Sequence, residues 1–212
     1  MIKLRASILA ISLLCVLAAL PVDGQTDNSK ESIEINKRPL VHLGEDASKA
    51  IKDGIDLSAE FLVEFSGTLG KDGKIDAKSA RFTRTEGDKR LSDLAKKAIE
   101  ATNDAGYFGY LSGLRMKNLK VLISQDSQNA SFVLSSESQN EPAAKAQRTT
   151  FDFLLVVMKH KQKEHLTTDA EKDDMALLES MTVSTEGKTL VIRSVLPNTV
   201  VQDMIKRRLA AK

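Results

Sequence analysis

Residues 61–99 read FLVEFSGTLGKDGKIDAKSARFTRTEGDKRLSDLAKKAI. Over the first positions, Phe and Val side chains alternate with mostly polar ones, which is the period of a strand with one buried face. Asp72-Gly73 predicts a turn, because glycine accepts the positive φ that tight turns require. A second strand is expected over residues 77–85, and from Leu91 onward the apolar spacing is that of a helix. The stretch therefore predicts a strand, turn, strand and helix.

The helix that follows the second strand has both a start signal and an apolar face. Asp88 precedes it and can accept hydrogen bonds from the first free N–H groups, as N-cap residues do. The side chains of one stripe recur at spacings of three and four, while the lysines and Arg90 lie outside it. The stripe consists of Leu91, Leu94, Ala95, Ala98 and Ile99.

This order of elements resembles the TonB and TolA carboxy-terminal domain family over residues 60–111. In that family an Asp-Gly turn follows the first strand, here Asp72-Gly73, and a Ser-x-Gly-like turn follows the second, here Glu86-Gly87-Asp88. The family's helix opens Leu-Asp-x-Ala-Ala. Here Ser92 replaces the aspartate, Leu94 replaces the first alanine, and the proline-bearing flanking segments are missing. The resemblance implies a periplasmic protein that contacts envelope partners, often through exposed sheet edges.

The amino-terminal residues 1–24 are typical of a secretory signal peptide. Lys3 and Arg5 precede an apolar core at residues 7–20. We expect cleavage after Gly24, with Ala19 as a weaker alternative, and a periplasmic or secreted mature chain. The apolar run is also close to the lower length limit of a membrane-spanning helix, so an uncleaved inner-membrane anchor is the alternative.

The composition limits the classes of site that the chain can carry. The only cysteine, Cys15, lies within the signal peptide, so the mature chain has no thiol for catalysis, metal binding or disulfides. A net charge of +2 gives no reason to expect nucleic-acid binding, which needs a concentrated basic surface. We expect an envelope protein as partner and no membrane contact beyond the amino-terminal segment.

The second half of the chain repeats helical and strand patterns. Pro142 opens a helix to about His160, and a capping box at residues 168–171 opens another to about Ser180. A hairpin turns at residues 186–188, and Asn198 is expected to cap a last helix. The inward stripe expected for the first of these helices is Ala146, Thr150, Phe153, Leu154, Val157 and Met158.

A short helix is expected over residues 46–55, with Asp46 as its cap. Two more strands are expected at residues 119–123 and 131–134, joined by a polar hairpin loop at 125–129. Together the patterns predict an α+β fold of antiparallel sheet units with packed helices, in the order ββα-ββ followed by α-α-ββ-α.

We divide the chain into a flexible lead-in at 25–45, a TonB-like unit at 46–137 and a second α+β unit at 138–212. The alternative is that the polar residues 135–142 join a strand to a helix that covers the same sheet.

The sequence contains no pattern typical of a catalytic, cofactor-binding or metal-binding site, so we predict no such residue and no cofactor. His160 and His165 are five residues apart, unlike a metalloprotease pair, and a zinc site would also need Glu164 or Asp169. The glycines within residues 67–73 do not have the spacing of a phosphate-binding loop, so we expect a turn there.

Three further clusters have structural interpretations that we prefer. The aromatic residues of segment 106–111 could form a ligand lip, but they more often close one end of a core. The acidic residues at 169–174 suit a helix N-terminus, and the basic residues at 206–208 suit a helix C-terminus. We therefore predict a non-enzymatic interaction or structural module, with a hydrolase or small-molecule carrier as the alternative.

Overall fold

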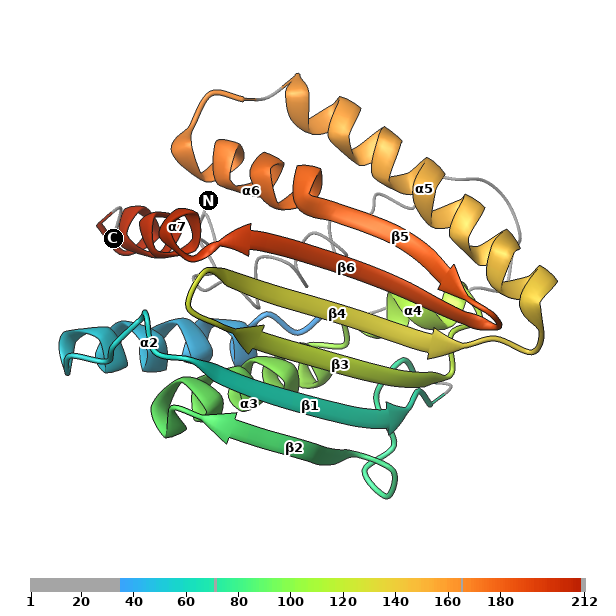
Figure 1. The fold of residues 1–212 in the computed structure, drawn as a ribbon, viewed down its shortest axis with the longest axis horizontal. Coiled ribbons are helices and arrows are strands. Elements are labelled where there is room, and N and C mark those ends of the chain that lie inside the picture. The colour runs from blue at the N-terminus through green and yellow to red at the C-terminus, as the bar shows by residue number, and fades with distance from the viewer. Residues whose placement is uncertain (1–34, 71, 165, 211–212) are drawn as a thin grey trace.

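The strand, turn, strand and helix predicted from residues 61–99 form β1 (Phe61–Thr68), β2 (Arg81–Gly87) and α3 (Lys89–Asp104) (Figure 1). The structure is a computed structural model that describes residues 35–70, 72–164 and 166–210. Asp88 accepts a hydrogen bond from the backbone N–H of Leu91, which confirms the predicted N-cap of α3. The predicted α+β fold class is confirmed.

Two glycines of this unit adopt a left-handed backbone that other residues rarely take. Gly73 has φ +75°, and an added Cβ would lie 2.6 Å from the Cα of Gly109. Gly87 has φ +78°, and a Cβ there would lie 2.2 Å from the carbonyl oxygen of Glu60. Both turns therefore need glycine for conformation and for close backbone approach.

All strands of the described chain belong to one antiparallel sheet with the order β2-β1-β3-β4-β6-β5. The remaining strands are β3 (Asn118–Gln125), β4 (Asn129–Glu137), β5 (Met181–Glu186) and β6 (Thr189–Pro197). β4 pairs with β6 from Asn129↔Pro197 to Glu137↔Thr189, so the sheet continues across the unit boundary suggested near residue 138. The division into two units stays a prediction.

Five further helices lie in the described part of the chain. They are α2 (Arg38–Lys52), α4 (Gly109–Gly113), α5 (Glu141–Lys163), α6 (Asp169–Ser180) and α7 (Asn198–Ala210). In Figure 1, α3 and α4 lie behind the sheet, α5 and α6 lie along its β5 edge, and α7 lies at the end where β6 finishes. α6 begins with the capping box that the sequence predicted.

The sheet has a buried face and a more exposed one. Val63, Val121 and Leu134 are fully buried at alternate positions of neighbouring strands, and Ile192 continues the row on β6. Residues of opposite parity, such as Lys120 and Arg193, are exposed. The period of two that identified the first strand thus recurs in β3, β4 and β5.

Two element boundaries differ from the sequence prediction. α2 begins at Arg38 rather than Asp46, because Pro39 suits the first helical turn and Leu40 is buried. Residues 38–45 are therefore helical, which corrects that part of the flexible lead-in predicted for 25–45, while residues 25–34 lie outside the described residues. β2 begins at Arg81 because Asp76 accepts the backbone N–H of Lys78 and closes a turn inside the expected strand.

The inward face of α5 was predicted only in part, because Met158 is buried as expected but Phe151 and Leu155 were not in the predicted stripe. Phe151, Leu155 and Met158 are buried, whereas Phe153 is 66% exposed. Residues 153–158 are apolar around the whole circumference of the helix, so periodicity alone does not choose the buried stripe.

The core consists of one large cluster and one small one. The large cluster covers the buried face of the sheet and includes Phe108, which is 1% exposed, so this ring of the aromatic segment closes part of the core as preferred. The small cluster joins Ala130 of β4 to Val201 and Ile205 of α7. Residues of both clusters line the cavity that is the candidate site.

Candidate functional site

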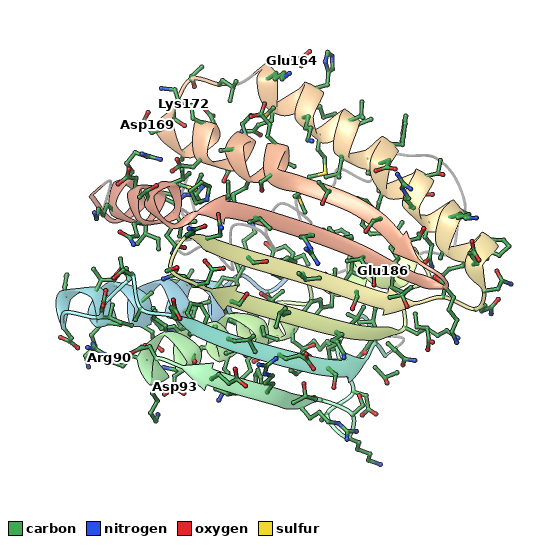
Figure 2. All side chains as sticks on the ribbon, in the orientation of Figure 1. Arg90, Asp93, Glu164, Asp169, Lys172 and Glu186 are labelled. Carbon is green, nitrogen blue, oxygen red and sulfur yellow. The ribbon has the colours of Figure 1, made fainter. Side chains whose placement is uncertain are left out.

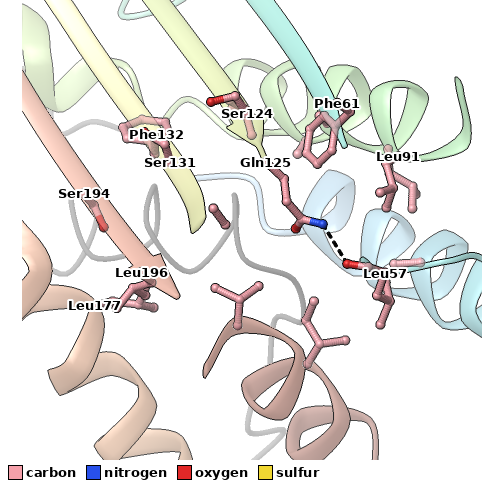
Figure 3. Close-up of a pocket in the computed structure, with 18 of the residues that line it drawn as sticks. Leu57, Phe61, Leu91, Ser124, Gln125, Ser131, Phe132, Leu177, Ser194 and Leu196 are labelled. Atoms are coloured by element: carbon pink, nitrogen blue, oxygen red, sulfur yellow. Dashed lines mark hydrogen bonds between the residues drawn. The ribbon is translucent and has the colours of Figure 1, made fainter. Parts of the chain in front are cut away.

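An apolar cavity of about 90 Å³ lies at one end of the sheet and is partly open to solvent (Figure 3). Its walls come from the start of β1, the β3–β4 hairpin, the end of β6 and the helices α2, α3, α6 and α7. A single water needs roughly 10–15 Å³. The space therefore suits several waters or part of an alkyl chain.

The lining of the cavity is almost entirely hydrocarbon. The apolar side chains are Ala47, Ile51, Leu57, Phe61, Leu91, Leu94, Ala95, Ala98, Ile123, Ala130, Phe132, Leu177, Leu196, Val201 and Ile205. The polar lining residues are Ser124, Gln125, Ser131 and Ser194. No Asp, Glu, Lys, Arg or His is among the described residues that line it, so the cavity favours an uncharged, apolar ligand.

One wall is the pair of helices α2 and α3, which charged side chains join on the outside. Arg90 of α3 donates to the carbonyl oxygens of Ala50 at 3.2 Å and Asp53 at 3.4 Å, near the end of α2. Lys97 of α3 pairs with Asp46 of α2 at 2.5 Å. Figure 2 shows Arg90 beside both helices, at the periphery of the molecule. Polar contacts thus hold this wall from outside and leave its inner face apolar.

The opposite wall is α7, whose start is bound to the β3–β4 hairpin. The side-chain Nδ2 of Asn198 donates to the carbonyl of Asp126 at 2.6 Å, and its backbone N–H donates to the carbonyl of Gln128 at 2.8 Å. Asn198 is the first residue of α7. The sequence predicted that its side chain would cap the free N–H groups of this helix, but the side chain binds the hairpin instead. The first turn of α7 then carries Val201 to the cavity.

The second half of α7 is fastened to α6 by a charged junction of Asp173, Asp174, Arg207 and Arg208. Arg207 lies 2.5 Å from Asp173, and Arg208 pairs with both aspartates. The Asp173 side chain is only 4% exposed, and its hydrogen bond raises the pKa of Arg207. The acidic and basic clusters, which the sequence assigned to separate helix ends, therefore meet and position α7.

Gln125 is the most informative polar residue of the cavity. It is 7% exposed, and its Nε2 donates to the carbonyls of Leu57 at 2.8 Å and Ala59 at 3.0 Å. Figure 3 shows the carboxamide among the lining side chains, with its nitrogen turned toward Leu57. The sequence placed Gln125 in a hairpin loop, but it is the last residue of β3. The sequence feature that could have placed Gln125 in the strand is the period of two, because Val121, Ile123 and Gln125 occupy alternate positions of β3.

The histidines do not meet as a site within the described chain. His42 lies 3.2 Å from Glu45, and His160 lies 3.5 Å from Glu164, both on the surface. His165 lies outside the described residues. Among the residues that the structure does describe, no group of three or more His, Cys, Asp or Glu side chains could hold a metal ion.

Three of the charged residues labelled in Figure 2, Asp93, Asp169 and Lys172, form local ion pairs on helix surfaces. Asp169 and Lys172, at the outer end of α6 in Figure 2, are 3.1 Å apart. Asp93 pairs with Lys89 at 2.6 Å on α3. These contacts occupy the side chains in i,i+3 and i,i+4 pairs typical of exposed helices.

The chain matches no family model, no curated protein and no solved structure. Within the described residues, none of the helices combines the length and the apolar character needed to cross a bilayer. The TonB-like resemblance, the amino-terminal signal and the cleavage site, which falls outside the described residues, stay predictions.

Proposed function

We propose that the protein is an exported envelope protein that binds an uncharged, apolar small molecule in the cavity and does not catalyse a reaction. The observation that carries this proposal is the hydrocarbon lining, which has no ionisable side chain among the described residues. General acid–base or nucleophilic chemistry needs a proton-transferring or activated group at the reacting atoms. The small-molecule carrier weighed from the sequence therefore has more support than the hydrolase.

The expected ligand is a linear or weakly branched hydrocarbon chain. Burial of apolar surface contributes about 0.8 kcal/mol for each CH₂ group. A cavity already formed in the folded chain also avoids part of the ordering cost of binding. An exported carrier of this kind would hold a lipid-derived chain away from water in the periplasm or outside the cell. Amino-terminal sequencing of the exported chain tests that location, since retention of Met1 would support the anchored alternative.

The test is to fill the cavity and measure binding. Ala130 of β4 is 5% exposed and lines the cavity, so Ala130→Phe puts a ring into space that a ligand would use. We expect methyl octyl ether to bind the exported chain in isothermal titration calorimetry and to lose at least tenfold in affinity in this variant. The matched control is Ala146→Phe, at an exposed position of α5, which should bind as the wild-type chain does.

Two results contradict the proposal. The first is a wild-type chain that takes up no methyl octyl ether or other alkyl ligand. The second is equal loss of affinity in Ala130→Phe and Ala146→Phe, which would place the effect outside the cavity. Circular dichroism of both variants checks that the fold is retained.

A second candidate function uses the β2 edge of the sheet. β2 pairs only with β1 in the described chain, and most of its side chains are exposed. An extended segment of an envelope partner could add to such an edge through backbone hydrogen bonds. The resemblance to the TonB and TolA domains supports this function. Affinity capture of the exported chain from envelope extract tests it, and recovery of a small molecule without any protein would contradict it.

A further inference from the structure

The orientation of the Gln125 carboxamide is fixed by its neighbours. The carbonyl oxygens of Leu57 and Ala59 can only accept hydrogen bonds, so the atom that faces both of them must be the amide nitrogen. The oxygen, Oε1, is consequently turned away from that loop. Gln125 is more than nine-tenths buried, and among the described residues no donor forms a hydrogen bond to Oε1.

Two polar side chains near this oxygen bind elsewhere, Ser194 of the cavity wall and Gln202 outside the wall. The hydroxyl of Ser194 is 2.5 Å from the hydroxyl of Ser180, a contact between β6 and α6. Gln202 of α7 turns its Nε2 to the Leu57 carbonyl at 3.5 Å, which is the same carbonyl that Gln125 binds. Oε1 itself keeps some accessible surface, unlike the enclosed and unpartnered side-chain oxygens of Ser136 and Asn198. A ligand in the cavity can therefore donate a hydrogen bond to it.

We propose that the cavity selects a neutral alkyl-chain ligand that carries one hydrogen-bond donor, a hydroxyl or an amide N–H, and that Gln125 Oε1 accepts this hydrogen bond. The inference rests on the proposed function and adds the polar group of the ligand. A fatty acid in its ionised form is disfavoured inside the cavity, because a carboxylate cannot donate to Oε1 and no cation lines the described part of the wall.

The test compares three ligands with the same alkyl chain. Methyl octyl ether has an oxygen but no donor, 1-octanol has a donor, and octanoate is ionised at neutral pH. We expect 1-octanol to bind the exported chain roughly three- to tenfold more tightly than the ether, the range of one net hydrogen bond. Octanoate should bind more weakly than either. Equal affinity for 1-octanol and the ether overturns the inference.

Two variants assign the preference to a side chain. Gln125→Met removes the acceptor and should lower the octanol-to-ether preference to about one while the ether still binds. Gln202→Met is the matched control, because it removes the other contact to the Leu57 carbonyl and should keep the preference. A preference that persists in Gln125→Met, or that both variants lose equally, overturns the inference.

A spectroscopic readout on the wild-type chain keeps the test independent of variant folding. The side-chain amide signals of Gln125 in ¹H–¹⁵N spectra should shift with 1-octanol and stay nearly unchanged with the ether. Shifts of equal size with both ligands contradict the inference. If none of the three ligands binds, the proposed function itself fails, whereas binding of the ether without selection of the alcohol removes only the inference about Gln125.

Discussion

The first turns of α7 and its last turn have different surroundings. Val201 and Ile205 border the cavity, where apolar packing is incomplete, while Arg207 and Arg208 in the last turn contact the aspartates of α6. Arg208 follows Val201 by seven residues and shares its stripe, so the contrast runs along the helix. The charged end fixes the position of α7 through specific, directional contacts, and the apolar turns therefore need not be tightly packed. A helix held at its charged end can border a space that a ligand fills.

The largest expected contrast is between two isoleucines truncated in the same way. Ile192 is 1% exposed in the large core cluster, and Ile205 is 8% exposed beside the cavity. Ile192→Ala should lower the free energy of unfolding by about 3–4 kcal/mol, as buried truncations do. Ile205→Ala should lower it by only about 1–2 kcal/mol, because its side chain has fewer packed neighbours on the cavity side.

Urea denaturation of the exported chain and both variants measures this difference. Equal costs for the two substitutions would mean that Ile205 is packed as tightly as the core, and the account of a loosely packed α7 wall would then be wrong.

The next contrast is between a largely buried ion pair and an exposed one. Asp173→Asn removes the charge that Arg207 and Arg208 share and should lower the free energy of unfolding by about 2 kcal/mol. The control is Asp152→Asn on α5, whose 3.4 Å pair with Arg148 is half exposed, and it should cost less than about 0.5 kcal/mol. If the two variants lose equal stability, the junction does not anchor α7.

A smaller effect concerns the acid stability of the α6 start. Hydrogen bonds from the Thr167 side chain and from the backbone and side chain of Thr168 lower the pKa of Glu171 from 4.5 to about 2. A lowered folded-state pKa gives stability that is present above the ordinary pKa and is lost as the pH falls through about 2. Glu171→Gln should therefore flatten the stability profile between pH 4.5 and 2. Thermal unfolding across that window checks this, and unchanged profiles would contradict the capping role.

Local signals predicted much of the fold. The Asp88 N-cap, the capping box of α6 and the strand periods of residues 61–65 act between neighbours in sequence, so their outcome is readable without the tertiary structure. The inward face of α5 was not readable, because its apolar residues surround the helix and packing against the β5 edge selects the stripe.

The candidate site depends on distant segments and was therefore missed. Gln125 meets Leu57 across a large sequence separation, and Asp173 meets Arg207 between two helices. Sequence spacing carries no information about such pairs. Gln125 was also assigned to the loop because it begins a run of polar residues, although it continues the buried face of β3. Only the tertiary arrangement places these residues beside one apolar cavity.

Methyl NMR of the exported chain during titration with methyl octyl ether shows directly where the ligand binds. Shifts should be concentrated in the methyl groups that line the cavity, above all those of Ile51, Val201 and Ile205. Val156, 66% exposed on α5, serves as the reference and should not move. Absence of shifts at the cavity, or shifts centred on Val156, would contradict the assignment of the cavity as the ligand site.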